Sequence, residues 1–178
     1  MKVINLFAGP GTGKSVTSSV LYGMLSLAGY AVQYVPEFAK FATYSKNTAA
    51  LSDQIYMFGK QENRLHVLKD GDLDFVIMDG PLPLALLYAP DAYYAHYEPL
   101  VMEVFSSYEN INFFLERNTS IPYQQNGRSQ DPKTAEELCE RTRNILVRHD
   151  VPFESVAVHP GVAAELFERL IGRPAPRL

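Results

Sequence analysis

The sequence lacks the features that would point to a membrane, a metal cluster or a nucleic-acid-coating protein. No uninterrupted apolar run reaches about 18 residues, so no transmembrane helix is expected. Cys139 is the only cysteine, which excludes an internal disulfide and a thiolate metal cluster. The formal net charge is −4, which weighs against non-specific binding to nucleic acid. Because no signal-peptide pattern is present either, we expect a cytoplasmic protein without membrane contact.

The chain does contain enough apolar material for one full core. It has 178 residues, of which 47% are hydrophobic and 20% charged, as in ordinary globular domains. Strand-like runs alternate with helical patterns, which predicts βαβ units and a doubly wound parallel α/β sheet of five strands. The expected strands span 2–7, 31–35, 75–78, 111–115 and 153–158. The expected helices span 14–28, 37–44, 52–69, 100–107, 134–149 and 162–171.

The domain plan that follows is simple. We expect a single domain over 1–172, with a polar lid segment over 116–133 and a flexible tail over 173–178. The stretch 81–99 is rich in proline and tyrosine and predicts no clear element.

A glycine-rich loop ending in Gly-Lys-Ser follows the first expected strand. Its glycines let successive N–H groups point at the phosphates of a nucleotide. Lys14 would reach the β- and γ-phosphates, the Ser15 hydroxyl would bind Mg²⁺, and the helix beginning near Gly13 adds its dipole. The loop therefore predicts binding of ATP with Mg²⁺. The expected nucleotide contacts are Gly9, Pro10, Gly11, Thr12, Gly13, Lys14, Ser15 and Val16.

Two acidic side chains stand just beyond the expected strands, at the edge where sheets of this kind bind ligands. Asp79 closes the third strand and would hold Mg²⁺; the alternative is a turn aspartate before a glycine. Glu37 follows the second strand and would accept a proton from an attacking hydroxyl or orient it. The alternative for Glu37 is a helix-start glutamate that complements the helix dipole.

Arginines gather after the fourth expected strand. A guanidinium stabilises the negative charge that spreads over a migrating phosphoryl group. Arg117 and Arg128 lie in expected loop segments and are the candidates for this role, in a lid that excludes water. The other arginines are expected on a solvated helix face that glutamates balance. These are Arg141, Arg143 and Arg148, with Glu136, Glu137 and Glu140.

A tyrosine-rich stretch follows the third expected strand. Aromatic faces stack on bases, so Tyr88 and Tyr93 are candidates for contact with a nucleoside-like substrate. Core packing beneath a long loop explains the same residues about as well.

These motifs together resemble the small P-loop kinases related to the ribosylnicotinamide kinase domain of the bacterial NAD regulator (the AAA-28 type). Members of that group bind ATP-Mg²⁺ and phosphorylate a hydroxyl of a nucleoside-like acceptor. The resemblance adds Asp53 and Gln61 to the expected acceptor contacts, beside Glu37. Lys40 and Asn126 stand where the family usually has arginine and aspartate, which leaves the acceptor open. The matching segments beyond the loop are 36–40, 53–54, 59–61, Asp79 and 121–128.

We therefore expect a kinase that moves the γ-phosphoryl group of ATP to a hydroxyl of a nucleoside or nucleotide. The compact chain also resembles bacteriophage-encoded kinases, some of which phosphorylate hydroxymethylpyrimidine bases within DNA, and this stays an alternative acceptor. A different class is a regulatory ATPase or GTPase without a small acceptor, although the Asn-Lys-x-Asp motif that reads guanine is missing. A homodimer is compatible with a kinase of this size.

Overall fold

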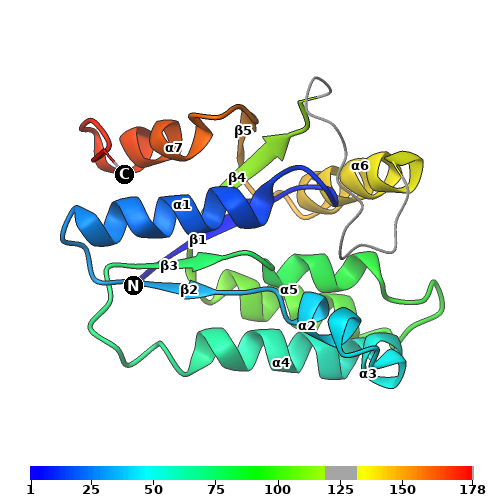
Figure 1. Cartoon of the computed structure of the whole chain (residues 1–178). Coiled ribbons are helices and arrows are strands. Elements are labelled where there is room, and N and C mark those ends of the chain that lie inside the picture. The colour runs from blue at the N-terminus through cyan, green and yellow to red at the C-terminus, as the bar shows by residue number, and fades with distance from the viewer. Residues whose placement is uncertain (119–131, 178) are drawn as a thin grey trace.

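The computed structural model of the chain describes residues 1–118 and 132–177. Five parallel strands form one sheet, in the order β2-β3-β1-β4-β5 (Figure 1). The predicted doubly wound α/β fold is thereby confirmed. The strands are β1 (Lys2–Phe7), β2 (Val32–Val35), β3 (Phe75–Met78), β4 (Glu109–Glu116) and β5 (Glu154–Ala157).

Helices cover both faces of this sheet. α1 and α7 pack on one face, and α4, α5 and α6 pack on the other (Figure 1). All strands run in the same direction, so their carboxyl ends meet at one edge, where α1 begins and α2 and α6 lie. The helices are α1 (Lys14–Leu27), α2 (Phe38–Tyr44), α3 (Thr48–Ser52), α4 (Gln54–His66), the 3₁₀ helix η1 (Leu82–Leu87), α5 (Tyr97–Ser106), α6 (Pro132–Arg148) and α7 (Val162–Ile171).

Alternation along the central strand builds the two halves of the core. Ile4 and Leu6 face α1 and α7, whereas Val3 and Phe7 face α4 and α5. All four side chains are almost completely buried, as expected of a strand covered on both faces. Within the described residues, no helix combines the length and the apolar character that a membrane crossing requires.

Most elements lie within a few residues of their predicted bounds, with differences that have local causes. The sequence analysis missed α3, which Asn47 caps by accepting a hydrogen bond from the Ala50 N–H (3.0 Å). The helix predicted from 100 begins at Tyr97 instead, and Pro99 falls in its first turn, where proline is tolerated.

The structure describes little of the predicted lid but most of the predicted tail. Most of the expected lid, at 119–131, lies outside the described residues. In the expected tail, Arg173 donates to the Ala28 carbonyl (3.3 Å), and Ala175 packs against the core beside α1. The flexibility of 173–178 stays a prediction.

The start of the glycine loop packs closely against α6. A methyl group on Gly9 would lie 2.7 Å from the Cys139 Cβ and 2.8 Å from the Ala135 carbonyl oxygen. We predict that Gly9→Ala destabilises the protein by about 1–3 kcal/mol through overpacking. The control is Gly59→Ala, where nothing lies within 4 Å, and which should be neutral or stabilising because α4 gains helix propensity. Urea unfolding midpoints measure both, and equal midpoints for Gly9→Ala and wild type would contradict the packing argument.

Candidate functional site

The loop between β1 and α1 is shaped by two residues in the left-handed region. Gly11 has φ 81° and Gly13 has φ 96°, which a side chain would disfavour. The Thr12 hydroxyl donates to the Gly9 carbonyl (2.8 Å) and closes the curl. Among the described residues, no side chain caps the start of α1, so the N–H groups of its first turn remain available to an anion. Val16 lies on this turn and is exposed.

Lys14 is the centre of the polar contacts at this edge. Its Nζ donates to the backbone carbonyl of Asp79, lies 3.3 Å from Glu37 Oε2 and 3.9 Å from Asp79 Oδ1. Burial by itself would lower the pKa of Lys14, but attraction to the Glu37 and Asp79 carboxylates outweighs it and raises that pKa. The ammonium is therefore charged at neutral pH.

Asp79 is buried and has one carboxylate oxygen without a hydrogen bond. Its Oδ2 accepts from the Tyr34 hydroxyl (3.1 Å), whereas its Oδ1 accepts no hydrogen bond from any described residue. A buried polar oxygen left this way is costly, so Oδ1 suits a cation or a water bound to one. The chemistry of Ser15 and Asp79, two oxygen donors, fits Mg²⁺, which binds through few protein ligands.

Glu37 precedes α2 but does not cap it. No side-chain hydrogen bond from Glu37 reaches the helix start, and its carboxylate turns to Lys14 instead. Gly80 allows this approach, because a methyl group there would lie 3.1 Å from the Glu37 Cγ. The carboxylate therefore faces the phosphate loop, and the catalytic role of Glu37 stays a prediction.

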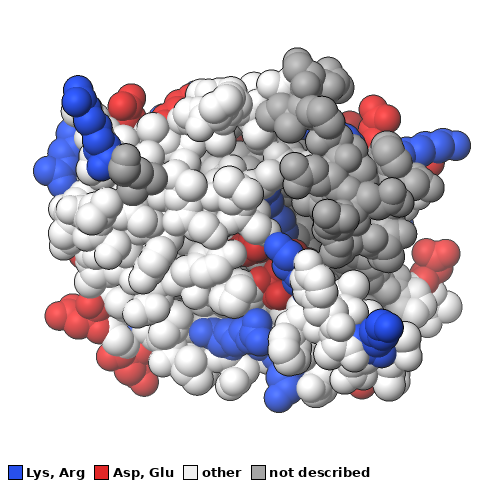
Figure 2. Space-filling view, viewed as in Figure 1, with Lys and Arg blue, Asp and Glu red and all other residues white. Residues whose placement is uncertain are grey.

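Lys40 is a site residue that the sequence analysis had noted only as a departure from the family pattern. Its Nζ donates to the Ser15 hydroxyl (3.1 Å) from α2. A second ammonium therefore lies at the end of the phosphate loop. Its spacing of three residues from Glu37, which places both at the start of one helix, could have indicated it. In Figure 2, basic and acidic side chains lie next to each other in a hollow in the middle of the face shown.

Three expected acceptor residues have other partners. Gln61 accepts from the Phe38 N–H (2.8 Å) and so fixes the turn that carries Glu37. Asp53 caps α4 through the Tyr56 N–H (2.9 Å). Tyr93 packs edge-on against Tyr97 and its hydroxyl lies 3.3 Å from the Ile55 nitrogen. Their polar groups serve the α2–α4 scaffold, a use that spacing along the chain does not reveal.

The prediction that glutamates of the same helix balance the α6 arginines is wrong. Arg143 pairs instead with Glu116 on β4 (3.0 Å), and Arg148 pairs with Glu98 on α5. Arg141 donates to the Leu87 carbonyl at the end of η1 (2.9 Å). Helical spacing puts these side chains near glutamates, but the neighbouring elements offer them better-placed acceptors.

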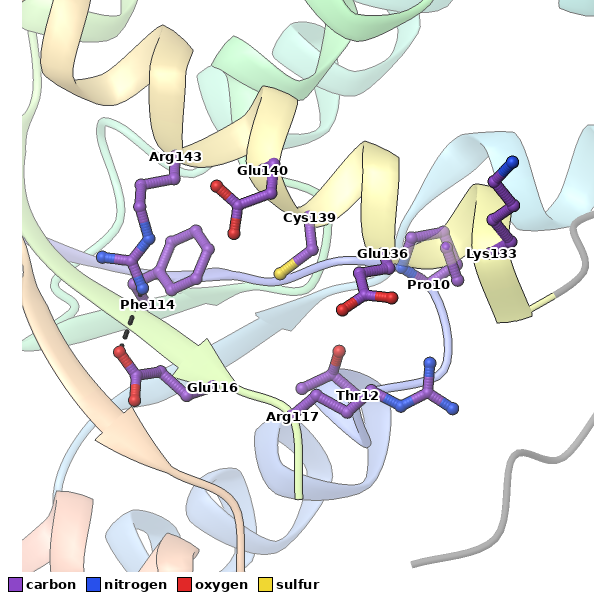
Figure 3. Close-up of a pocket in the computed structure, with 11 residues that line it drawn as sticks. Pro10, Thr12, Phe114, Glu116, Arg117, Lys133, Glu136, Cys139, Glu140 and Arg143 are labelled. Atoms are coloured by element: carbon purple, nitrogen blue, oxygen red, sulfur yellow. Dashed lines mark hydrogen bonds and ion pairs between the residues drawn. The ribbon is translucent and has the colours of Figure 1, made fainter. Parts of the chain in front are cut away.

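Arg117 belongs to a second hollow, on the α6 side of the phosphate loop. This pocket has a volume of about 590 Å³ and lies between Pro10 and Thr12 of the loop, the end of β4 and the first half of α6. Figure 3 shows Arg117 extending from the end of β4 beside Thr12, with Glu136 and Cys139 projecting from α6. Lys14, Glu37 and Asp79 do not line it. Arg128 lies outside the described residues.

A glycine loop at the end of the central strand, with a buried carboxylate directly after the neighbouring strand, is the arrangement of a P-loop nucleotide-binding protein. The chain belongs to the AAA_28 family, described as an AAA domain, whose model matches residues 3–162. No curated protein matches the sequence.

The solved structures that share the fold include two that were determined with a bound nucleotide. Deoxyadenosine kinase from M. mycoides, solved with dATP, has a TM-score of 0.60 at 18% identity, over 97% of this chain and 100% of that one. Kti12 from Chaetomium thermophilum, in complex with ADP-AlF3, has a TM-score of 0.50 at 13% identity, over 98% and 100%. At these identities the likeness is one of fold.

The hydrogen bond from Tyr34 to Asp79 makes a pH-dependent contribution to stability. Burial first, and then the Asp79 carboxylate, raises the pKa of the Tyr34 hydroxyl above its usual range. The folded state thus holds this proton more tightly, and the stabilisation is present below about pH 10, the unfolded value, and lost above it. We predict that Tyr34→Phe costs about 1–3 kcal/mol at pH 7, because Asp79 Oδ2 loses its donor.

Above pH 10, the free energy of unfolding of Tyr34→Phe should fall less steeply with pH than that of wild type. Urea titrations at pH 7 and in the alkaline range measure both effects. The control is Tyr44→Phe, an exposed residue of α2, which should match wild type throughout. A constant difference between wild type and Tyr34→Phe across the alkaline range would refute the linkage.

Proposed function

We propose that this protein is an ATP-dependent kinase that transfers the γ-phosphoryl group to a hydroxyl of a nucleoside- or nucleotide-like acceptor. The observation that carries the proposal is the position of the Glu37 carboxylate, 3.3 Å from the Nζ of Lys14 in the phosphate loop. Gly80 leaves the space in which the Glu37 side chain lies. A base at this distance from the phosphate site reaches the atom that attacks the γ-phosphorus. The fold shared with a deoxyadenosine kinase supports the same class of reaction.

The donor binds through the loop. N–H groups of the loop and of the first α1 turn surround the phosphates, and Lys14 places its charge at the β- and γ-phosphates. A phosphate competes with the carboxylates for the Lys14 ammonium, which in the free protein contacts Glu37. Nucleotide binding therefore loosens the Lys14–Glu37 pair and frees the Glu37 carboxylate for its role as base.

Ser15 and Asp79 are the residues that would hold Mg²⁺. When bound there, Mg²⁺ would offset the negative charge that develops during transfer. Lys40, which contacts the Ser15 hydroxyl in the free protein, remains next to this position and adds a second positive charge.

Glu37 then takes the proton from the acceptor hydroxyl as the new bond to phosphorus forms. The bond between the γ-phosphorus and its bridging oxygen breaks, and ADP leaves. Arg117, from the α6 side of the loop, and Arg128 are proposed to stabilise the transferring charge. Tyr88, close to Glu37, is proposed to contact the acceptor.

The competing class is a regulatory ATPase that uses water in place of an acceptor. The likeness to Kti12, solved with ADP-AlF3, is compatible with it. The two functions differ in one measurable property, which is whether phosphoryl transfer needs an acceptor. A screen with radiolabelled ATP therefore covers nucleosides, nucleotides, and plain and hydroxymethylated DNA.

We predict that Glu37→Gln lowers the rate of transfer by about 10²–10⁴-fold, because the base is lost. Lys14→Ala should abolish both transfer and nucleotide binding, whereas Glu37→Gln should still bind ATP. The control is Glu109→Gln, an exposed carboxylate at the opposite end of β4. Hydrolysis of ATP at full rate without any acceptor, unchanged in Glu37→Gln, would overturn the kinase proposal.

We also predict that Asp79→Asn weakens the Mg²⁺ dependence of nucleotide binding. The apparent affinity for Mg²⁺ in the ADP complex should fall about 10- to 100-fold, as for other residues that orient a metal's ligands. Calorimetric titration of ADP with and without MgCl₂ measures this directly. Asp70→Asn, an exposed turn residue, serves as the control, and an identical gain from Mg²⁺ in wild type and Asp79→Asn would exclude the assigned role.

A further inference from the structure

The short helix η1 connects Glu37 with an arginine of α6. It starts just after Gly80, where an added methyl group would lie 3.1 Å from the Glu37 Cγ, and it ends at Leu87. The Nη2 of Arg141 donates to the Leu87 carbonyl (2.9 Å). The guanidinium thus lies at the far end of the segment that begins beside the proposed base.

Tyr88, the next residue, lies where these charges act together. Its side chain is 44% exposed. Removal from water and then the Glu37 carboxylate raise the pKa of the Tyr88 hydroxyl, whereas Lys14 and Arg141 act in the opposite direction. All three charged groups are therefore close enough to influence one hydroxyl on the acceptor side.

Arg141 has no carboxylate partner within the described part of the chain. Glu137, one helical turn before it, makes no ion pair with it, and its one hydrogen bond goes to a neutral carbonyl. Arg143 and Arg148 on the same helix are both paired with carboxylates. Among the described residues, the Leu87 carbonyl is the one hydrogen-bond acceptor of Arg141, and the planar guanidinium with its five N–H donors matches the geometry of a phosphate.

The proposed base restricts which atom of the acceptor attacks. A carboxylate removes a proton from a neutral hydroxyl, but it repels an ionised phosphate oxygen, which needs no base. A phosphate on the acceptor would thus bind at Arg141, away from Glu37, and a hydroxyl of the same molecule would face Glu37.

We propose that Arg141 binds a phosphate group of the acceptor, so that the acceptor is a nucleotide that is phosphorylated on a hydroxyl and not on the phosphate it already carries. The inference rests on the proposed kinase function and narrows it. The γ-phosphorus of ATP bonds to the hydroxyl oxygen, the proton passes to Glu37, ADP leaves, and the product carries two separate phosphate esters.

Binding tests the role of Arg141 without turnover. Calorimetry measures the four deoxynucleosides and their 5′-monophosphates against protein saturated with AMPPNP and Mg²⁺. Wild type should bind at least one monophosphate 10-fold or more tighter than its nucleoside, and Arg141→Gln should weaken that affinity about 10- to 100-fold, as for a lost charge-assisted contact. Arg148→Gln, whose arginine pairs with Glu98, is the control and should bind as wild type does.

Several results would overturn the inference. Nucleosides that bind as tightly as their monophosphates, or a panel with no ligand at all, contradict a phosphate subsite. Weaker AMPPNP binding in Arg141→Gln, with acceptor affinity retained, would assign Arg141 to the donor instead.

The product separates this inference from the kinase function itself. Phosphorus NMR of the reaction with ATP should show two monoester signals and no new phosphoanhydride other than ADP. Nucleoside diphosphates, or phosphorylation of free nucleosides alone, would overturn the inference while the kinase function stands. ATP hydrolysis without transfer to any compound would contradict both.

Discussion

The structure of this site depends on where one ammonium group is held. Lys14 lies between two carboxylates that come from the ends of two different strands, β2 and β3. Each of these charges would be costly to bury without the others, because the penalty for an unpaired buried ion is several kcal/mol. A nucleotide's phosphates are the other partner that can satisfy the same ammonium. In the free protein the two carboxylates are the partners of this ammonium.

The strand order puts different groups on the two sides of the loop. β3, next to β1, supplies Asp79, and β2 beyond it supplies the turn with Glu37. β4, on the other side, leads to Arg117 and the pocket against α6. The close packing at Gly9 and Gly80 leaves no room for a side chain at either position, so that α6 lies against the start of the loop and the Glu37 turn lies against the end of β3.

Prediction from the sequence succeeded where the signal is local. The glycine loop, the strand ends and the α/β alternation each lie within a few residues of chain, and so the fold and the positions of Lys14 and Asp79 followed directly. It failed where partners are distant. The α6 arginines pair across to β4, α5 and η1, and Gln61 reaches back to the turn before α2.

The sequence by itself determined that the chain forms a parallel α/β sheet with a phosphate-binding loop, because backbone propensities and apolar periodicity are written residue by residue. Tertiary structure alone decided that the Glu37 carboxylate faces Lys14 instead of its own helix, that Lys40 contacts Ser15, and that Arg141, among the described residues, bonds to a carbonyl and to no carboxylate. Such pairings depend on which helices and strands pack side by side, and residues far apart in the sequence come within hydrogen-bond distance only once the chain is folded.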